Sequence, residues 1–141
     1  MSLSPYLIFN GRCEEAIEYY RKTLGAEVIA KMRFSDSPEP HPPGMIPPGA
    51  EKNIMHAELR IGDASLMCSD GCPTDKPAVF QGFSIALSLQ EVAKAQKLFN
   101  TLAADGQVRM PVNKTFFSPG FGMVVDRFGV SWMLLTCPPQ K

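Results

Sequence analysis

The amino-acid sequence contains the same succession of predicted elements twice, and this repeat constrains the fold more than any other feature. Each half has an apolar strand, an amphipathic helix and then three strand-like segments. Shifted by 79 positions, Pro5, Ile8, Ala16 and Tyr20 fall on Ser84, Leu87, Ala95 and Phe99; shifted by 66, Ser65 and Met67 fall on Ser131 and Met133. The sequence therefore predicts two βαβββ modules, at about residues 1–72 and 80–138 of one 141-residue domain.

Turn and helix signals set the expected bounds of each element. In the first half we expect strands over 3–9, 26–34, 53–61 and 64–69, and a helix over 13–24 that Gly25 ends. In the second half, Ser88 and Glu91 have the spacing of a capping box and predict a helix that extends to about Ala103. The strands of this half are expected over 82–89, 107–112, 122–126 and 131–137.

One helix per module can cover only one face of a four-stranded sheet. Neither module could then bury both faces by itself, so the two should combine. The predicted fold class is α+β, with paired βαβββ modules that form a curved, cup-like mixed sheet. The helices would lie outside, and the concave face would be available to a ligand.

A proline-rich loop over residues 35–51 interrupts the first module. Six of the thirteen prolines lie between Pro38 and Pro48, which excludes regular structure there. Long connections of this kind are typical of mobile flaps or binding loops. The loop could act as a lid, contact a partner subunit or stay disordered.

The charge pattern excludes several classes of partner. Fourteen basic and fourteen acidic residues give a net charge of zero, and the basic residues are scattered singly. Nucleic acids and anionic membrane surfaces attract clustered cations, so neither is an expected partner. No apolar run is long enough to span a bilayer, and the N-terminus lacks signal-peptide features. A soluble, cytoplasmic protein is expected.

The four cysteines do not have the spacing of a zinc site. Only Cys68 and Cys72 are close in sequence, and neither a second pair nor a pair of histidines completes a ligand set. Cys68 and Cys137 lie in apolar strand-like segments, where a free cysteine behaves as a small hydrophobic residue. We therefore expect both to be buried.

Three segments resemble the PhnB-like branch of the vicinal oxygen chelate superfamily, which includes glyoxalase I, extradiol dioxygenases and the fosfomycin and bleomycin resistance proteins. They are SPYLIFNGRCEEAIEYYRKTLGA, IMHAELRIGDASLMCSD and TFFSPGFGMVVDRFGVSWML. The resemblance implies the paired βαβββ fold and a homodimer. Some similar sequences are called 3-demethylubiquinone 3-methyltransferases, but this chain has no glycine-rich strand-to-helix turn of the kind that holds a methyl donor.

Metalloenzymes of that superfamily hold a divalent ion with side chains of the first and last strands of each module. The motif match places Pro5 and Ser84 at the first-strand positions and Met67 and Met133 at the last-strand positions. Proline offers no donor, and a thioether is a poor ligand for these ions. No metal or other cofactor is therefore expected, although a rearranged divalent-metal site around His56 is an alternative.

His56 is the candidate catalytic residue, with Glu58 as the residue that orients it. The two share one face of an alternating strand, so His56 would act as a general base or donor if that face lines the cup. A solvated histidine beside a surface carboxylate is the alternative. Tyr6, Met67, Ser84, Phe116, Phe117, Phe121 and Met133 are the candidate ligand-binding residues.

Aromatic side chains near the C-terminus admit two interpretations. Phe116 and Phe117 lie in an irregular segment and predict a pocket rim, whereas Phe128 and Trp132 favour the core. Asp126 is expected to form a turn.

Three functions follow from these observations. The favoured one is a metal-free protein of the resistance type that binds a small, partly apolar molecule. The alternatives are a metal-dependent lyase or dioxygenase around His56 and a methyltransferase-like role.

Overall fold

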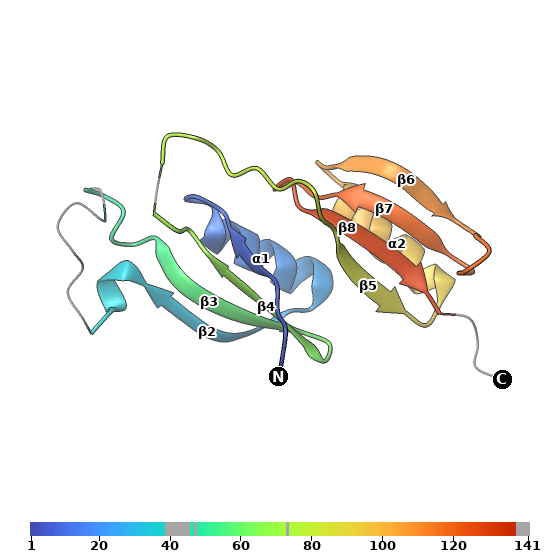
Figure 1. The fold of residues 1–141 in the computed structure, drawn as a ribbon, viewed down its shortest axis with the longest axis horizontal. Coiled ribbons are helices and arrows are strands. Elements are labelled where there is room, and N and C mark those ends of the chain that lie inside the picture. The colour runs from blue at the N-terminus through green and yellow to red at the C-terminus, as the bar shows by residue number, and fades with distance from the viewer. Residues whose placement is uncertain (39–45, 47, 73, 138–141) are drawn as a thin grey trace. The chain divides into compact units, whose positions relative to one another are not determined.

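The computed structural model describes residues 1–38, 46, 48–72 and 74–137, and the chain divides into two compact units, Met1–Ala78 and Val79–Lys141. Each unit contains one four-stranded mixed sheet and one helix (Figure 1). This confirms the predicted α+β architecture of paired βαβββ modules. None of the helices in the described ranges is long and apolar enough to cross a membrane.

The N-terminal unit has the strand order β1-β4-β3-β2. β1 pairs in parallel with β4, and the other pairs are antiparallel. The elements are β1 (Tyr6–Ile8), α1 (Cys13–Leu24), β2 (Glu27–Arg33), the 3-10 turn η1 (Phe34–Asp36), β3 (Ile54–Ile61) and β4 (Ala64–Ser69).

The helix α1 has the predicted bounds because its apolar spacing and its end signal agree. Ala16, Ile17 and Tyr20 lie on the buried side of the helix. Gly25 adopts φ 66°, a left-handed conformation that glycine accepts without strain, and its N–H bonds the carbonyl of Tyr20.

The C-terminal unit repeats this arrangement with the order β5-β8-β7-β6, where β5 and β8 are parallel. The remaining pairs are antiparallel. The elements are β5 (Ile85–Leu89), α2 (Val92–Ala103), β6 (Gln107–Asn113), β7 (Phe121–Val125) and β8 (Ser131–Thr136).

Two predictions about this unit are wrong at the strand ends. The expected capping box of Ser88 and Glu91 is absent from α2: Glu91 is the N-cap residue and makes no side-chain cap hydrogen bond. The reason is that β5 continues to Leu89, so Ser88 pairs with Leu135 in the sheet. Cys137 is exposed because β8 ends at Thr136, whereas Cys68 is buried as predicted.

A buried carboxylate holds the N-terminal unit together at one end of its sheet. Asp70 is 2% exposed and follows β4. One oxygen accepts hydrogen bonds from the N–H groups of Gly11 at 2.7 Å and Cys13 at 2.8 Å, and the other from that of Ile54 at 2.8 Å. Asp70 therefore caps α1 and joins it to the start of β3 and the end of β4.

Asp126 has the corresponding structural role in the C-terminal unit, where it follows β7. It accepts hydrogen bonds from the N–H groups of Phe128 at 2.9 Å and Val130 at 3.1 Å, and from the indole of Trp132 at 2.8 Å. Phe128 and Trp132 are both buried. The predictions that Asp126 forms a turn and that these two aromatic residues belong to the core are confirmed.

The structure describes only part of the proline-rich loop. Residues 39–45 and 47, which include His41, lie outside the described residues. The predicted roles of the loop as a lid or a subunit contact fall on these residues. At its ends, Phe34 and Ala50 are buried. The N–H of Phe34 donates to the carbonyl of Asn53 at 3.1 Å, and that of Ser35 to the carbonyl of Glu51 at 2.9 Å.

Candidate functional site

Each sheet packs one face against the helix of its own unit, and we call the opposite face the open face. In the N-terminal unit, Ala57, Leu59, Leu66 and Cys68 are buried, and the residues between them in β3 and β4 lie on the other face. The register then places six side chains together on the N-terminal open face: Tyr6, Ile8, Met32, His56, Glu58 and Met67.

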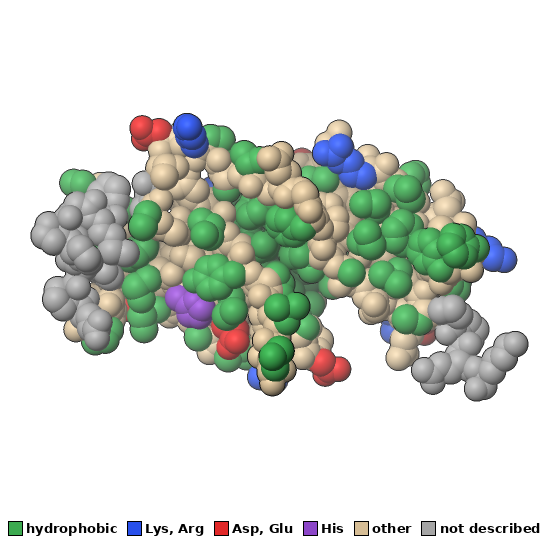
Figure 2. Space-filling view, viewed as in Figure 1, with side chains coloured by type: hydrophobic (Ala, Val, Ile, Leu, Met, Phe, Trp, Pro, Cys, Tyr) green, Lys and Arg blue, Asp and Glu red, His purple; other side chains and the backbone are tan. Residues whose placement is uncertain are grey.

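The N-terminal open face combines exposed apolar surface with a few polar groups. Tyr6 is 45% exposed, Ile8 51% and Met32 36%. In Figure 2 a histidine (purple) lies among hydrophobic side chains (green) on this part of the surface. An exposed apolar patch with convergent polar groups is typical of a ligand-binding surface.

His56 is hydrogen-bonded and stacked against Tyr6. The Tyr6 hydroxyl lies 3.0 Å from His56 Nδ1, and the ring centroids are 5.6 Å apart at an interplanar angle of 30°. β1 carries Tyr6 and β3 carries His56, on either side of β4. The sheet therefore positions the two rings beside each other on the open face.

This contact determines what a neutral His56 offers to a ligand. Burial raises the pKa of the Tyr6 hydroxyl above its ordinary value, so Tyr6 keeps its proton at neutral pH. When Tyr6 donates to Nδ1, the proton of the neutral imidazole is on Nε2. His56 then presents an N–H donor, and a ligand would meet it with an acceptor such as a carbonyl or phenolic oxygen.

The structure brings the sequence-predicted residues Tyr6, His56, Glu58 and Met67 together on this open face. Glu58 and Met67 are paired across β3 and β4. The partner of His56 differs from the expectation, because Tyr6 rather than Glu58 contacts the imidazole. Ile8 and Met32 were missed. Strand alternation from Tyr6 could have identified Ile8, whereas Met32 requires the register of β2 with β3.

The predicted first-strand positions are wrong, by one residue for Pro5 and by two residues for Ser84. Tyr6, not Pro5, pairs with Met67, and Ala86, not Ser84, pairs with Met133. The sequence match was anchored on the helices, and the connections from strand to helix differ in length, residues 9–12 against 90–91. A shift of one residue, as at Pro5, moves a side chain to the opposite face of a strand, whereas a shift of two, as at Ser84, keeps it on the same face.

The corrected positions do not fit the divalent metal that the superfamily uses. Tyrosine, alanine and two methionines offer one phenol and two thioethers, which are poor donors for hard or borderline cations. Across the described ranges, no group of three or more His, Cys, Asp or Glu side chains could hold a metal ion. The residues at these positions therefore do not form the metal site of the superfamily.

The C-terminal open face is apolar. Phe121, Met123, Met133 and Leu135 are paired across β7 and β8 and alternate with the buried residues that face α2. The ring of Phe117 lies 5.1 Å from that of Phe121, edge to face, and the fully exposed Phe116 lies 5.1 Å from Phe117.

The polar groups of this second face are few. The hydroxyl of Ser84 is 2.6 Å from that of Ser131 at the start of β8. The C-terminal unit therefore contains the sequence-predicted residues Ser84, Phe116, Phe117, Phe121 and Met133, and Phe117 contacts Phe121 on its open face.

The buried cysteines do not add a nucleophile to either face. Cys13 and Cys68 are 0% and 1% exposed. A hydrogen bond to Cys68, followed by burial, raises the pKa of the Cys13 thiol far above its usual range. A thiol that stays protonated is neither a good nucleophile nor a metal ligand, so Cys13 is a core residue.

Comparisons with known proteins agree with this architecture. The sequence profile of the 3-demethylubiquinone-9 3-methyltransferase family matches residues 1–135. Protein YjdN of Escherichia coli is 43% identical over 95% of this chain and 94% of its own. A crystal structure of a Pseudomonas aeruginosa protein is 42% identical, with a TM-score of 0.83 and coverage of 97% of this chain and 98% of that one.

Two further solved structures have the same fold. A Bacillus cereus protein, described as a putative 3-demethylubiquinone-9 3-methyltransferase and PhnB protein, is 25% identical with a TM-score of 0.77, covering 97% of this chain and 100% of that one. A glyoxalase-related enzyme from Fulvimarina pelagi has the same fold at 15% identity and a TM-score of 0.64, covering 98% and 88%. The chain therefore belongs to the PhnB-like, 3-demethylubiquinone-9 3-methyltransferase family and has the glyoxalase/bleomycin-resistance fold.

Proposed function

We propose that the protein binds a small, partly apolar molecule on its N-terminal open face, without the metal that is usual in the superfamily. The observation that carries this proposal is the hydrogen bond between Tyr6 and His56 in the middle of exposed apolar side chains. Ile8, Met32 and Met67 supply apolar contact area, and methionine adapts to irregular ligand shapes.

The ligand chemistry follows from the groups on this face. His56 Nε2 offers a donor, and Glu58 offers an acceptor two residues along β3 on the same side. A flat or partly apolar ligand can bind both groups when it carries an acceptor for His56 and, beside it, a donor for Glu58. Planar aromatic compounds that carry a carbonyl or a phenol group have this chemistry.

The methyltransferase in the family's name is not part of this proposal. The strand-to-helix connections, residues 9–12 and 90–91, contain one glycine between them, which is unlike the glycine-rich turns that hold a methyl donor. A calorimetric titration with S-adenosylmethionine that shows binding would favour the methyltransferase role instead.

A thermal-shift screen of planar aromatic carbonyl and phenol compounds tests the proposal. A compound at about a hundred times its dissociation constant adds about 2.7 kcal/mol of stability. We expect His56→Ala to lower the affinity for the best compound about three- to tenfold, because one hydrogen bond is lost. Lys22→Ala, an exposed change on α1, is the matched control and leaves the affinity unchanged.

The same screen is run with and without a chelator. Stabilisation that survives the chelator and falls in His56→Ala supports metal-free binding on this face. Stabilisation that appears only with added Mn, Fe, Ni or Zn would contradict it and favour the metal-dependent alternative.

A further inference from the structure

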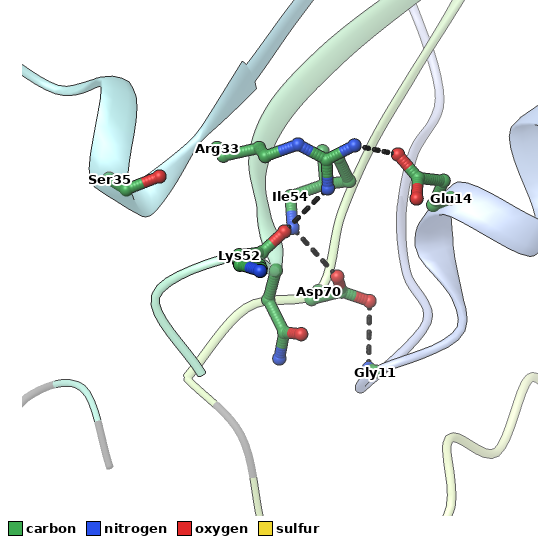
Figure 3. Close-up of a pocket in the computed structure, with 8 residues that line it drawn as sticks. Gly11, Glu14, Arg33, Ser35, Lys52, Ile54 and Asp70 are labelled. Atoms are coloured by element: carbon green, nitrogen blue, oxygen red, sulfur yellow. Dashed lines mark hydrogen bonds and ion pairs between the residues drawn. The ribbon is translucent and has the colours of Figure 1, made fainter. Parts of the chain in front are cut away.

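A pocket lies in the N-terminal unit, at the end of the sheet where Asp70 holds α1. It has a volume of about 510 Å³. Its lining comes from four places in the chain: the start of α1, the end of β2 with η1, the start of β3 and the end of β4 (Figure 3). The lining side chains are mostly charged or polar: Glu14, Arg33, Ser35, Lys52, Asn53 and Asp70.

Backbone hydrogen bonds fix the walls of this pocket. Asp70 binds the N–H groups of Gly11 and Ile54, which are both lining residues, at 2.7 and 2.8 Å. The N–H of Asp70 donates to the carbonyl of Ile54 at 2.8 Å. Three N–H groups already surround the Asp70 carboxylate, so its oxygens have few acceptor sites left for other groups in the pocket.

Arg33 is the principal cation of the pocket, and its position does not depend on Glu14 alone. Its guanidinium donates to the carbonyl of Lys52 at 2.6 Å and also contacts the Glu14 carboxylate (Figure 3). The first bond holds the guanidinium in place while the second can be exchanged. A positioned guanidinium is the preferred group for binding carboxylates and phosphates.

The ion pair between Arg33 and Glu14 can be exchanged at small cost. The Glu14 side chain is 50% exposed, and pairs so exposed contribute only about 0 to 1 kcal/mol. Lys31 also approaches Glu14, at 3.4 Å, so Glu14 keeps a cation when Arg33 turns to a ligand. The hydrogen bond from Arg33, opposed by partial burial, lowers the pKa of Glu14, which is therefore ionised at neutral pH.

Further donors line the same space. Among the residues that the structure describes, none bonds to the ammonium of Lys52, the hydroxyl of Ser35 or the side-chain amide of Asn53. Figure 3 shows the Ser35 hydroxyl on the side of Arg33. Together with Arg33, these groups provide more hydrogen-bond donors than the exposed carboxylate of Glu14 can accept.

We propose that this pocket binds the oxyanion group of a small carboxylate or phosphate compound, with Arg33 as its main contact. The oxyanion replaces Glu14 on the guanidinium, and Lys52, Ser35 and Asn53 supply the remaining hydrogen bonds. The pocket is separate from the N-terminal open face, so this binding is independent of the function proposed above.

An NMR titration of the full chain with inorganic phosphate and with acetate tests the proposal, with sodium chloride holding the ionic strength constant. We expect saturable shifts of the Arg33 side chain and of the amides of Ser35, Lys52 and Asn53. Dissociation constants of about 1 to 10 mM are expected, which correspond to about 3 to 4 kcal/mol. Saturation by phosphate alone assigns a phosphate ligand, and saturation by acetate alone assigns a carboxylate.

Three variants distinguish a specific anion-binding site from general electrostatic attraction of anions to the protein. Arg33→Gln is expected to weaken binding at least about tenfold. Arg60→Gln removes an exposed arginine of β3 in the same unit and is expected to leave the dissociation constant within about twofold. Glu14→Gln removes the competing carboxylate and is expected to tighten binding about threefold or more.

Several outcomes would overturn the proposal. They are the absence of saturable shifts from both anions up to about 50 mM, equal weakening by Arg60→Gln and Arg33→Gln, or unchanged or weaker binding in Glu14→Gln. Glu14 is an exposed residue, so its variant keeps the test decisive even where Arg33→Gln does not fold.

Discussion

Replacing Asp70 by alanine is expected to destabilise the N-terminal unit by about 3 to 5 kcal/mol. The change leaves three backbone N–H groups, those of Gly11, Cys13 and Ile54, without their acceptor. Each unsatisfied buried donor costs about 1 to 3 kcal/mol, and solvent entering the vacated space recovers part of this. Asp70 is 2% exposed, so these hydrogen bonds are largely shielded from solvent in the folded unit.

Denaturant unfolding measures this effect, and hydrogen exchange of the α1 and β3 amides locates it. The matched control is Asp63→Ala in the turn between β3 and β4, where an exposed aspartate is removed and a change within about 0.5 kcal/mol is expected. If Asp70→Ala were as mild as Asp63→Ala, the proposed link between α1, β3 and β4 would be wrong.

Asp126→Ala is the second change for which we expect a loss of about 3 to 5 kcal/mol. It removes the acceptor of two backbone N–H groups and of the Trp132 indole, which is 1% exposed. Because Trp132 is the single tryptophan of the chain, its fluorescence reports directly on the C-terminal unit. We expect a lower denaturant midpoint and altered indole emission in the folded state.

Asp105→Ala is the control for this second experiment. The Asp105 side chain is 81% exposed and pairs with Arg127 at 3.5 Å, a contact worth little at the surface. A loss of stability in Asp126→Ala no larger than in Asp105→Ala would show that the three hydrogen bonds do not stabilise the unit.

Local signals made much of this fold predictable from the sequence. The helix α1 has the predicted bounds because its amphipathic spacing ends at Gly25, and β4 has them because the turn at Gly62-Asp63 sets its start. Such patterns depend on neighbours within a few residues. The helix-against-sheet packing then followed from the requirement that each module bury an apolar face.

Features that depend on distant residues were not predictable in the same way. Asp70 lies far along the chain from Gly11 and Cys13, and only the parallel pairing of β1 with β4 brings them together. The partner of His56 was missed for the same reason, since Tyr6 belongs to another strand. The errors of one residue at Pro5 and of two residues at Ser84 arose because the length of a strand-to-helix connection is not encoded in an apolar pattern.

The position of a bound ligand can be measured directly with methyl-labelled methionine. Met32 and Met67 lie on the N-terminal open face, whereas Met123 and Met133 lie on the C-terminal open face. A planar aromatic compound found in the thermal-shift screen is titrated into the labelled protein while the methyl resonances are followed. Met32 and Met67 are expected to shift and to saturate together, and His56→Ala is expected to weaken both responses. Saturable shifts at Met123 and Met133 alone, unchanged in His56→Ala, would contradict it.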